Sequence, residues 1–203
     1  MKRTFYGIVF VSFLVLVAGC ASVNLEKKGE AVVKKSGAFS YIKEDSGMAI
    51  VVDVELAKRR TEEPYFPLGI KIANKRLDRI VVNRETLVLV DEKGQVYQMP
   101  DVVEIQKKYD KLAPDHKFKS QTGILGDQIL TSFSFYRKVE SRLFPQTQGG
   151  GRVINSVYIP TTAYMEDLVY FPMPEGGIKG KILRLRLDVL ELENPFEIAF
   201  PID

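Results

Sequence analysis

Apolar and polar residues alternate along several stretches of this chain, and this period of two restricts the fold more than any other feature. Successive side chains of a strand point to opposite faces of a sheet, so such alternation predicts a strand with one buried face. The stretches 65–73, 181–189 and 196–202 show the pattern. In 48–56 the apolar positions are Ile50, Val52, Val54 and Leu56.

Shorter strands are expected between these stretches. In 86–99, TLVLVD and QVYQM flank a segment that ends in Gly94, which can adopt the positive φ of a hairpin turn. Residues 152–159 and 168–171 also predict strands, whereas 161–167 predicts a loop or a short turn of helix. After Val189 the apolar phase shifts by one residue, which is typical of a β-bulge.

The stretch 101–143 breaks the alternation and predicts helices. Asp101 suits an N-cap, and Pro114 is expected to end the helix that follows it. The apolar positions recur at helical spacing and are Val102, Ile105, Tyr109 and Leu112.

A second helix is expected within 127–144, although the pattern leaves a strand open. The helical face would be Ile129, Phe133, Tyr136, Val139 and Leu143; the alternating set is Ile129, Thr131, Phe133 and Phe135. The helix is favoured because 137–142 shows no alternation.

These elements predict a mainly β protein with one antiparallel β-sandwich domain over 38–203 and a helical insertion at about 101–151. Helix and strand do not alternate along the chain, as they would in a parallel sheet. The expected core comprises Ile50, Val52, Val54, Phe66, Leu68, Ile70, Leu185, Leu187 and Phe200.

Three stretches resemble the immunoglobulin-like domains of secreted bacterial lipoproteins. They are TLVLVDEKGQVY (86–97), Ile159-Pro160 and LVYF (168–171). In those domains a strand ending in Asp, a Gly turn and a Tyr strand precede a loop and an aromatic strand ending in Pro. The resemblance implies an immunoglobulin-like sandwich and no common activity, and 101–151 departs from it as an insertion.

The N-terminus has the order of a secretory signal peptide. Lys2 and Arg3 precede the apolar run FYGIVFVSFLVLV, and small residues lead to the only cysteine of the chain, Cys20. Val17-Ala18-Gly19-Cys20 resembles the lipobox of bacterial lipoproteins. The resemblance implies cleavage after residue 19 and attachment of diacylglyceryl and N-acyl (palmitate-type) lipid to Cys20, with 20–37 as a flexible tether.

Two alternatives remain at this terminus. Residues 4–25 carry no charge over 22 positions, which is long enough for an uncleaved membrane anchor, and ordinary cleavage without lipid is the other. Each would place the rest of the chain outside the cytoplasm. The residue after Cys20 is Ala21 and not Asp. If the host has two membranes, the resemblance to bacterial lipoproteins then implies export to the outer membrane, with the domain facing the periplasm.

Composition narrows the partners. Without Lys2 and Arg3, 27 of the 29 basic side chains remain against 26 acidic ones, which argues against a nucleic-acid partner. No cysteine follows Cys20, so stability is expected from packing without disulfides.

Few residues predict chemistry. His116 is the only histidine and is expected in a polar loop, which disfavours a metal site and a Ser–His nucleophile. Two clusters of carboxylates could cleave glycosides if their members are held at the needed separation. One cluster is Glu166 with Asp167, and the other is Asp188, Glu191 and Glu193. The aromatic residues Tyr158, Tyr164, Tyr170 and Phe171 could bind sugar or pack in the core.

The favoured hypothesis is therefore a membrane-anchored envelope lipoprotein that acts as a non-enzymatic interaction or structural module, with an envelope protein as partner and without cofactor or metal. The alternative is a carboxylate-dependent envelope hydrolase or a carbohydrate-binding protein. Carboxylates that converge in a concave pocket would favour this alternative. Function is expected in the insertion, with its first helix at the border of a groove and its second packed inward.

Replacing Cys20 by Ser should release the protein from the membrane or leave an unprocessed precursor, because lipid attachment needs the thiol. Mass spectrometry and detergent-phase partitioning measure both effects. Identical mass and identical partitioning of wild type and Cys20→Ser would show that the lipobox interpretation is wrong.

Overall fold

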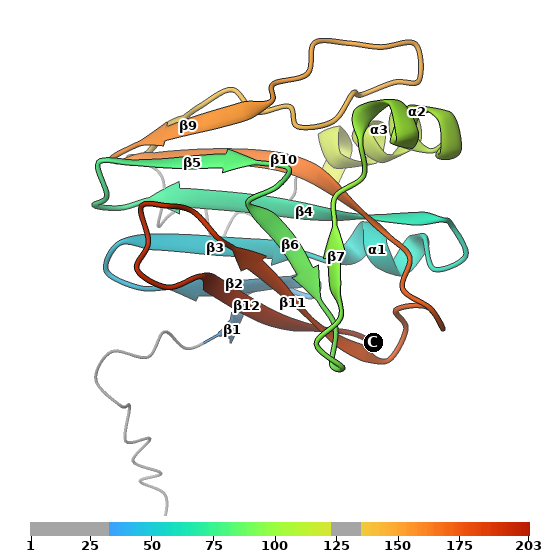
Figure 1. The fold of residues 1–203 in the computed structure, drawn as a ribbon, viewed down its shortest axis with the longest axis horizontal. Helices are drawn as coiled ribbons and strands as arrows, with labels where there is room; N and C mark the ends of the chain where they lie inside the picture. Colours follow the sequence, from blue (N-terminus) through green and yellow to red (C-terminus); the bar gives the residue numbers. More distant parts are fainter. Residues whose placement is uncertain (1–32, 123–134) are drawn as a thin grey trace, which may run out of the picture. The chain divides into compact units, whose positions relative to one another are not determined.

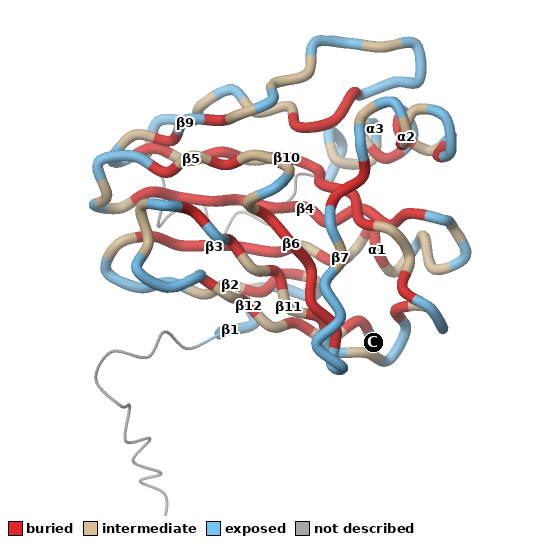
Figure 2. The backbone as a smooth tube through the Cα atoms, in the orientation of Figure 1, coloured by how far each residue is buried: buried red, intermediate tan, exposed pale blue. Residues whose placement is uncertain are grey.

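The strand β4 (Tyr65–Asn74) runs through the middle of the larger sheet, and all ten of its residues are buried (Figures 1 and 2). It pairs antiparallel with β3 on one side and with β10 on the other, from Ala163–Asn74 to Pro172–Tyr65. The computed structural model describes residues 33–122 and 135–203, and 31–203 form one compact unit.

Three sheets make up the described part of the chain. The six-stranded sheet has the order β1 (Lys34–Lys35), β2 (Ser40–Glu44), β3 (Met48–Asp53), β4, β10 (Ala163–Pro172), β8 (Arg137–Lys138). The four-stranded sheet has the order β12 (Phe196–Ile202), β11 (Lys181–Leu187), β6 (Leu87–Val90), β7 (Val96–Gln98). A third sheet pairs β5 (Arg79–Asn83) with β9 (Ser156–Pro160). Apart from β8, which is parallel to β10, the pairings are antiparallel.

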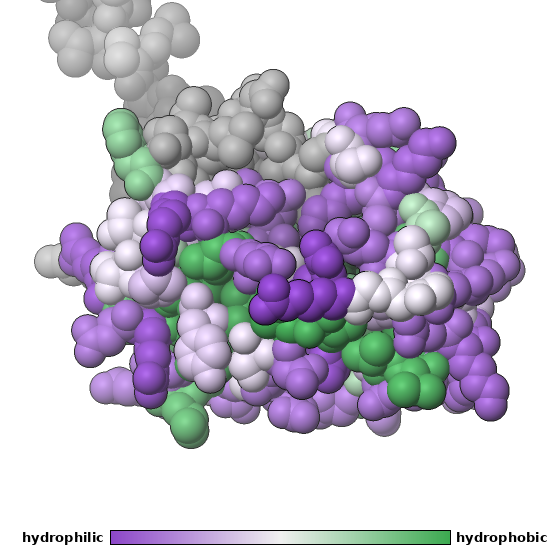
Figure 3. Space-filling model, turned by 90° about the horizontal axis from the view of Figure 1, so that it is seen from above, coloured by the Kyte–Doolittle hydropathy of each residue, from purple (hydrophilic) through white to green (hydrophobic). Residues whose placement is uncertain are grey.

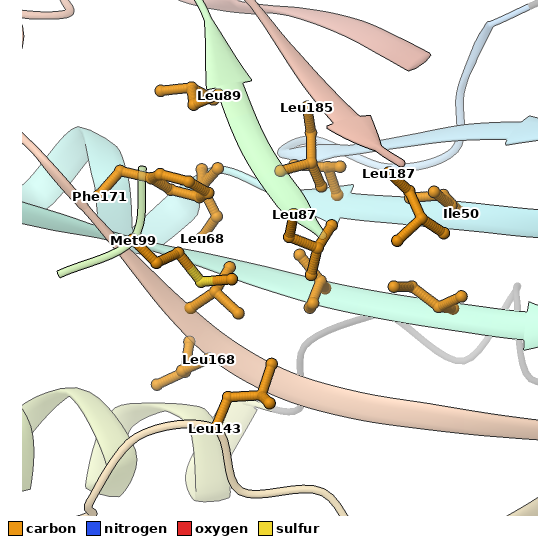
Figure 4. Packing of buried hydrophobic residues seen from close by; sticks show 14 of the residues in the cluster. Ile50, Leu68, Leu87, Leu89, Met99, Leu143, Leu168, Phe171, Leu185 and Leu187 are labelled. Carbon is orange, nitrogen blue, oxygen red and sulfur yellow. The ribbon is translucent and has the colours of Figure 1, made fainter. Parts of the chain in front are cut away.

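The core lies between the six-stranded and four-stranded sheets. Leu68 and Ile50 meet Leu87, Leu185 and Leu187 from the opposite sheet (Figure 4). At one side of the core the rings of Tyr41 and Phe200 are 6.3 Å apart. All nine residues of the expected core are buried, which confirms the mainly β prediction, and the alternation is confirmed in β11 and β12. The prediction of one buried face is wrong for β3 and β4, which are buried on both faces.

Within residues 33–122 and 135–203, three helices join the strands: α1 (Glu55–Arg59), α2 (Val102–Lys108) and α3 (Leu112–Thr122). Asp101 caps α2 as expected, because its carboxylate accepts the backbone N–H of Val103 at 2.7 Å. The hairpin β6–β7 is also confirmed, with Gly94 at φ 81° in its turn.

Two helix predictions are wrong. Pro114 does not end a helix: it lies in the first turn of α3, where a missing N–H leaves no hydrogen bond unmade. Residues 137–138 form the strand β8, because the edge of β10 offers partners for their backbone: Arg137 N–H donates to Thr162 O at 3.1 Å and Val139 N–H to Tyr164 O at 2.8 Å. Ile129 and Phe133 lie outside the described residues.

Three strand boundaries also differ. The strand expected over 48–56 ends at Asp53, whose carboxylate accepts Glu55 N–H at 3.0 Å and starts α1. Residues 163–167, expected in a loop, belong to β10 because β4 pairs with them along its length. The phase shift after Val189 is a turn and not a bulge, since Leu192 N–H donates to Val189 O and Leu190 is fully exposed.

Replacing Leu185 by Ala should lower the free energy of unfolding by about 2–5 kcal/mol, because a fully buried leucine leaves a cavity. The neighbouring Arg184 has a side chain 42% exposed and a 3.6 Å ion pair with Glu197, so Arg184→Ala should cost no more than about 1 kcal/mol. Urea unfolding measures both, and equal losses would contradict the strand phase.

Candidate functional site: a charged cleft beside β10

A cleft of about 800 Å³ opens between α3, the segment around β8 and the strand β10. Ten residues line it: His116, Lys119, Ser120, Lys138, Val139, Glu140, Ser141, Gln146, Glu166 and Asp167. Eight of them fall in the stretch 101–151, which the sequence analysis singled out as the carrier of function.

The edge of β10 holds one wall of the cleft in place. After β8, Ser141 Oγ donates to Glu166 O at 2.7 Å, and Leu143 N–H donates to Asp167 Oδ2 at 2.7 Å. Leu143 and Phe144 are then buried in the core. This wall is therefore anchored by both hydrogen bonds and apolar packing.

A buried ion pair positions the other wall, α3. The Oδ1 atom of Asp115 accepts two hydrogen bonds from the Arg60 guanidinium, at 2.9 and 2.7 Å, and Oδ2 accepts the hydroxyl of Tyr109. Asp115 is fully buried, and Arg60 is the residue that follows α1. Paired in this way, Asp115 fixes the turn of α3 that carries His116 and Lys119.

Glu166 lies between two lysines on the side of the cleft nearest β4. Its Oε2 atom is 3.3 Å from Lys138 Nζ and 3.9 Å from Lys71 Nζ. Lys71 is 2% exposed, and its ammonium also lies 5.0 Å from the ring centre of Tyr164. Burial lowers the pKa of Lys71, while Glu166 raises it. Glu166 is thus committed to compensating a charge inside the sheet.

Asp167 is committed to the backbone. Its Oδ1 atom accepts Leu168 N–H at 2.9 Å, while Leu143 N–H occupies Oδ2. The side chain is 3% exposed, and burial raises the pKa of its carboxyl, an effect that Lys119 and these backbone donors oppose. Asp167 therefore holds the backbone at Leu143 against β10.

The cationic groups around the cleft are less well paired. Lys119 makes no hydrogen bond or ion pair with any described residue, although Asp167 and Glu166 attract it electrostatically. Within the same described part, His116 Nε2 and Arg142 Nε are buried without a hydrogen-bond partner. Burial, Lys119 and Arg142 lower the pKa of His116 to about 4, so the imidazole is neutral at pH 7.

The structure brings together only some of the residues singled out from the sequence. Glu166 and Asp167 lie on β10 and not in the expected loop, and they line one cleft together with Glu140. The interaction-module hypothesis predicted no such convergence of carboxylates, so this expectation is wrong. The other cluster of carboxylates, Asp188, Glu191 and Glu193, lies beyond the end of β11. There Glu191 Oε1 is 3.5 Å from Arg79 Nε. His116 lies on α3 and not in a polar loop.

The four aromatic residues are separated as well. Tyr170 and Phe171 are buried in the core, Tyr164 is half-buried beside Lys71, and Tyr158 is 62% exposed on β9. They form no shared surface on which a sugar ring could stack. Core packing, the other option left open by the sequence, describes Tyr170 and Phe171.

The first helix of the insertion does not border the groove. Ile105, Tyr109 and Leu112 are buried in the core, where the ring of Tyr109 lies 6.2 Å from Tyr65 and 5.5 Å from Tyr170. The groove is bordered by α3 instead, because Asp115 holds that helix beside β10.

The lysines of the site were not predicted from the sequence. Lys71 did carry a signal: it is the one charged residue in the apolar stretch YFPLGIKIA of 65–73, and a charge inside a buried strand needs a partner. Lys119 and Lys138 carried none, since charged residues are common on exposed surfaces.

Exposed apolar side chains of the described residues come from separate elements. The large ones are Val33, Val96, Val103, Phe135, Tyr158, Ile182 and Leu190. The face seen from above in Figure 3 is mainly hydrophilic, with smaller hydrophobic areas between charged side chains. No group of three or more His, Cys, Asp or Glu within 33–122 and 135–203 could hold a metal ion, and none of the helices described there is long and apolar enough to cross a bilayer. Cys20 lies outside these residues.

Comparisons with known proteins add little. No protein-family model matches the sequence, and no curated protein matches it. Two solved structures from Bacillus subtilis, a "putative lipoprotein (ycdA)" and the yjhA protein, each superpose with a TM-score of 0.37 and 12% identity over 85% of this chain. That overlap spans 39% of the first protein and 96% of the second. At this TM-score the likeness supports no statement about fold or function.

The pH dependence of stability should report the burial of His116. Its pKa is lowered from 6.5 to about 4, so the unfolded state binds more protons between these values, and the stabilisation present above pH 6.5 is lost as pH falls towards 4. Asp53, Asp115 and Asp167 have raised pKa values and the opposite sign, but they are common to wild type and variant.

His116→Gln should therefore lose less stability than wild type between about pH 7 and about pH 5. Urea midpoints at the two pH values measure the difference. Parallel pH profiles for the two proteins would contradict a buried neutral imidazole.

Proposed function

We propose that this chain is an envelope lipoprotein, anchored through lipid on Cys20, that acts as a non-enzymatic interaction module and binds its partner at the cleft beside β10. The sequence Val17-Ala18-Gly19-Cys20 after an apolar run supports the anchor. The observation that carries the binding role is the state of the cleft: Glu166 and Asp167 are engaged within the protein, whereas Lys119 pairs with no described residue.

The engaged carboxylates favour binding over hydrolysis. Glycoside cleavage needs one carboxylic acid that donates a proton and a second carboxylate that acts as base or nucleophile, both directed at the substrate. Both oxygens of Asp167 accept backbone N–H groups, and Glu166 contacts two ammonium groups.

The same proposal covers location and fold. The lipid would hold the domain at the outer membrane, facing the periplasm, if the host has two membranes, and the partner would be an envelope protein and not a nucleic acid. The two packed antiparallel sheets would be an immunoglobulin-like sandwich in which α2, α3 and the segment around β8 form the insertion.

Capture from solubilised envelope tests the role of the cleft. The full-length lipidated protein should retain a specific envelope component, Lys119→Met should lose it, and Lys107→Met should keep it. Lys107 is the matched control because it is an exposed lysine on α2, outside the cleft. Retention that is unchanged in Lys119→Met would place the interface elsewhere.

An activity assay on the same proteins tests the enzyme alternative. Cell-wall glycan incubated with wild type should release no new reducing ends above the Glu166→Gln background. Release by wild type that Glu166→Gln abolishes would replace the binding role with carboxylate-dependent hydrolysis.

A further inference from the structure

We propose that the cleft between α3 and β10 binds the carboxylate or phosphate group of a small polar molecule or chain end, with Lys119 as its main contact. This inference rests on the proposed function and specifies the chemistry of the ligand.

The first argument is that Lys119 has no direct partner among the described residues, although two lysines and three carboxylates line the cleft. Lys71 and Lys138 share the single carboxylate of Glu166. The oxygens of Asp167 are taken by Leu143 and Leu168 N–H groups. Neither carboxylate forms an ion pair with Lys119, although both attract it electrostatically. Glu140 also lines the cleft, but it is exposed and makes no contact with Lys119 among the described residues.

The second argument is independent of charge counting. The Nε2 atom of His116 and the Nε atom of Arg142 are buried without a hydrogen-bond partner among the described residues. Buried polar atoms in folded proteins nearly always have partners, and an exception indicates a bound water or ion. These two nitrogens lie on the same side of the domain as the ammonium of Lys119, which also has no partner among the described residues. Together they indicate a site for a hydrogen-bond acceptor in this region.

The missing acceptor should be anionic. Guanidinium and ammonium groups form their strongest hydrogen bonds with carboxylate or phosphate oxygens. Burial lowers the pKa of Lys119, and a bound anion would oppose that effect as Asp167 and Glu166 do. His116 lines the cleft and Lys119 and Arg142 act on it electrostatically, so the three groups lie within reach of one another's fields. A bound anion would be attracted by Lys119 and Arg142 and would favour the protonated form of His116.

The size of the cleft indicates that the anion belongs to a larger molecule. A volume of about 800 Å³ is in the range of small-molecule sites and far exceeds the space of a single ion. Ser120, Ser141 and Gln146 line the remainder and offer hydroxyl and amide groups to a polar body.

The single histidine of the chain provides a direct readout. Its Cε1–H resonance is the only one of its kind, so NMR follows His116 without assignment. Full-length protein in detergent is titrated with sodium phosphate or sodium citrate, and chloride is adjusted to keep ionic strength constant. At least one of the two anions should shift the resonance saturably and raise the pKa of His116 from about 4.

Variants assign the effect to the cleft. Lys119→Met should weaken binding about tenfold or more, because a charged hydrogen bond is lost. Lys119→Arg keeps the charge and should retain more affinity than Lys119→Met, whereas the exposed Lys107→Met should match wild type. Citrate and phosphate distinguish a carboxylate ligand from a phosphate ligand.

Two results would overturn the inference: no saturable shift with either anion, or equal affinity in wild type and Lys119→Met. The envelope capture experiment is separate from this one. Lys119-dependent capture without anion binding would leave the proposed function intact and remove only the anionic ligand.

Discussion

A lysine ammonium in the centre of a fully buried strand is the constraint on which the rest of this structure depends. Lys71 lies in β4, which has β3 and β10 as neighbours in the six-stranded sheet and is buried along its whole length. An unpaired charge at such a position would be very costly, so its neighbours must compensate it. Glu166 does so from β10, in register opposite Lys71, and Lys138 joins Glu166 from β8. Glu166 thus links the charged side chains of the cleft to a charge buried inside the sheet.

A second buried charge pair ties the helices to this sheet. Arg60 follows α1 and holds Asp115 of α3, and the hydroxyl of Tyr109 completes the carboxylate's partners. The ring of Tyr109 packs on Tyr65 of β4 and Tyr170 of β10. The stretch 102–122 is therefore part of the core and not an appendage, and the cleft is a gap between two parts of one packed structure, which gives its side chains fixed positions.

The proposed role combines an anchor with this preorganised cleft. A lipid on Cys20 would confine the domain to a membrane surface, where a local ligand is presented at high effective concentration. The cleft would contribute selectivity: Glu166 and Asp167 are engaged within the protein, whereas Lys119 pairs with no described residue and would attract an anionic group. Specificity of this kind comes from polar groups that lack a partner until the ligand arrives.

The sequence by itself determined the mainly β class, the strands with clear alternation, the hairpin at Gly94, the cap at Asp101 and the nine core residues. Each of these is specified by neighbours along the chain, through side-chain periodicity or a local hydrogen bond. Only the tertiary structure decided that residues 137–138 form a strand, that Pro114 lies inside a helix and that Glu166 and Asp167 face Lys119 across a cleft. These outcomes depend on partners distant in sequence, such as the edge of β10 for Arg137 and the guanidinium of Arg60 for Asp115, and no local pattern encodes the position of such a partner.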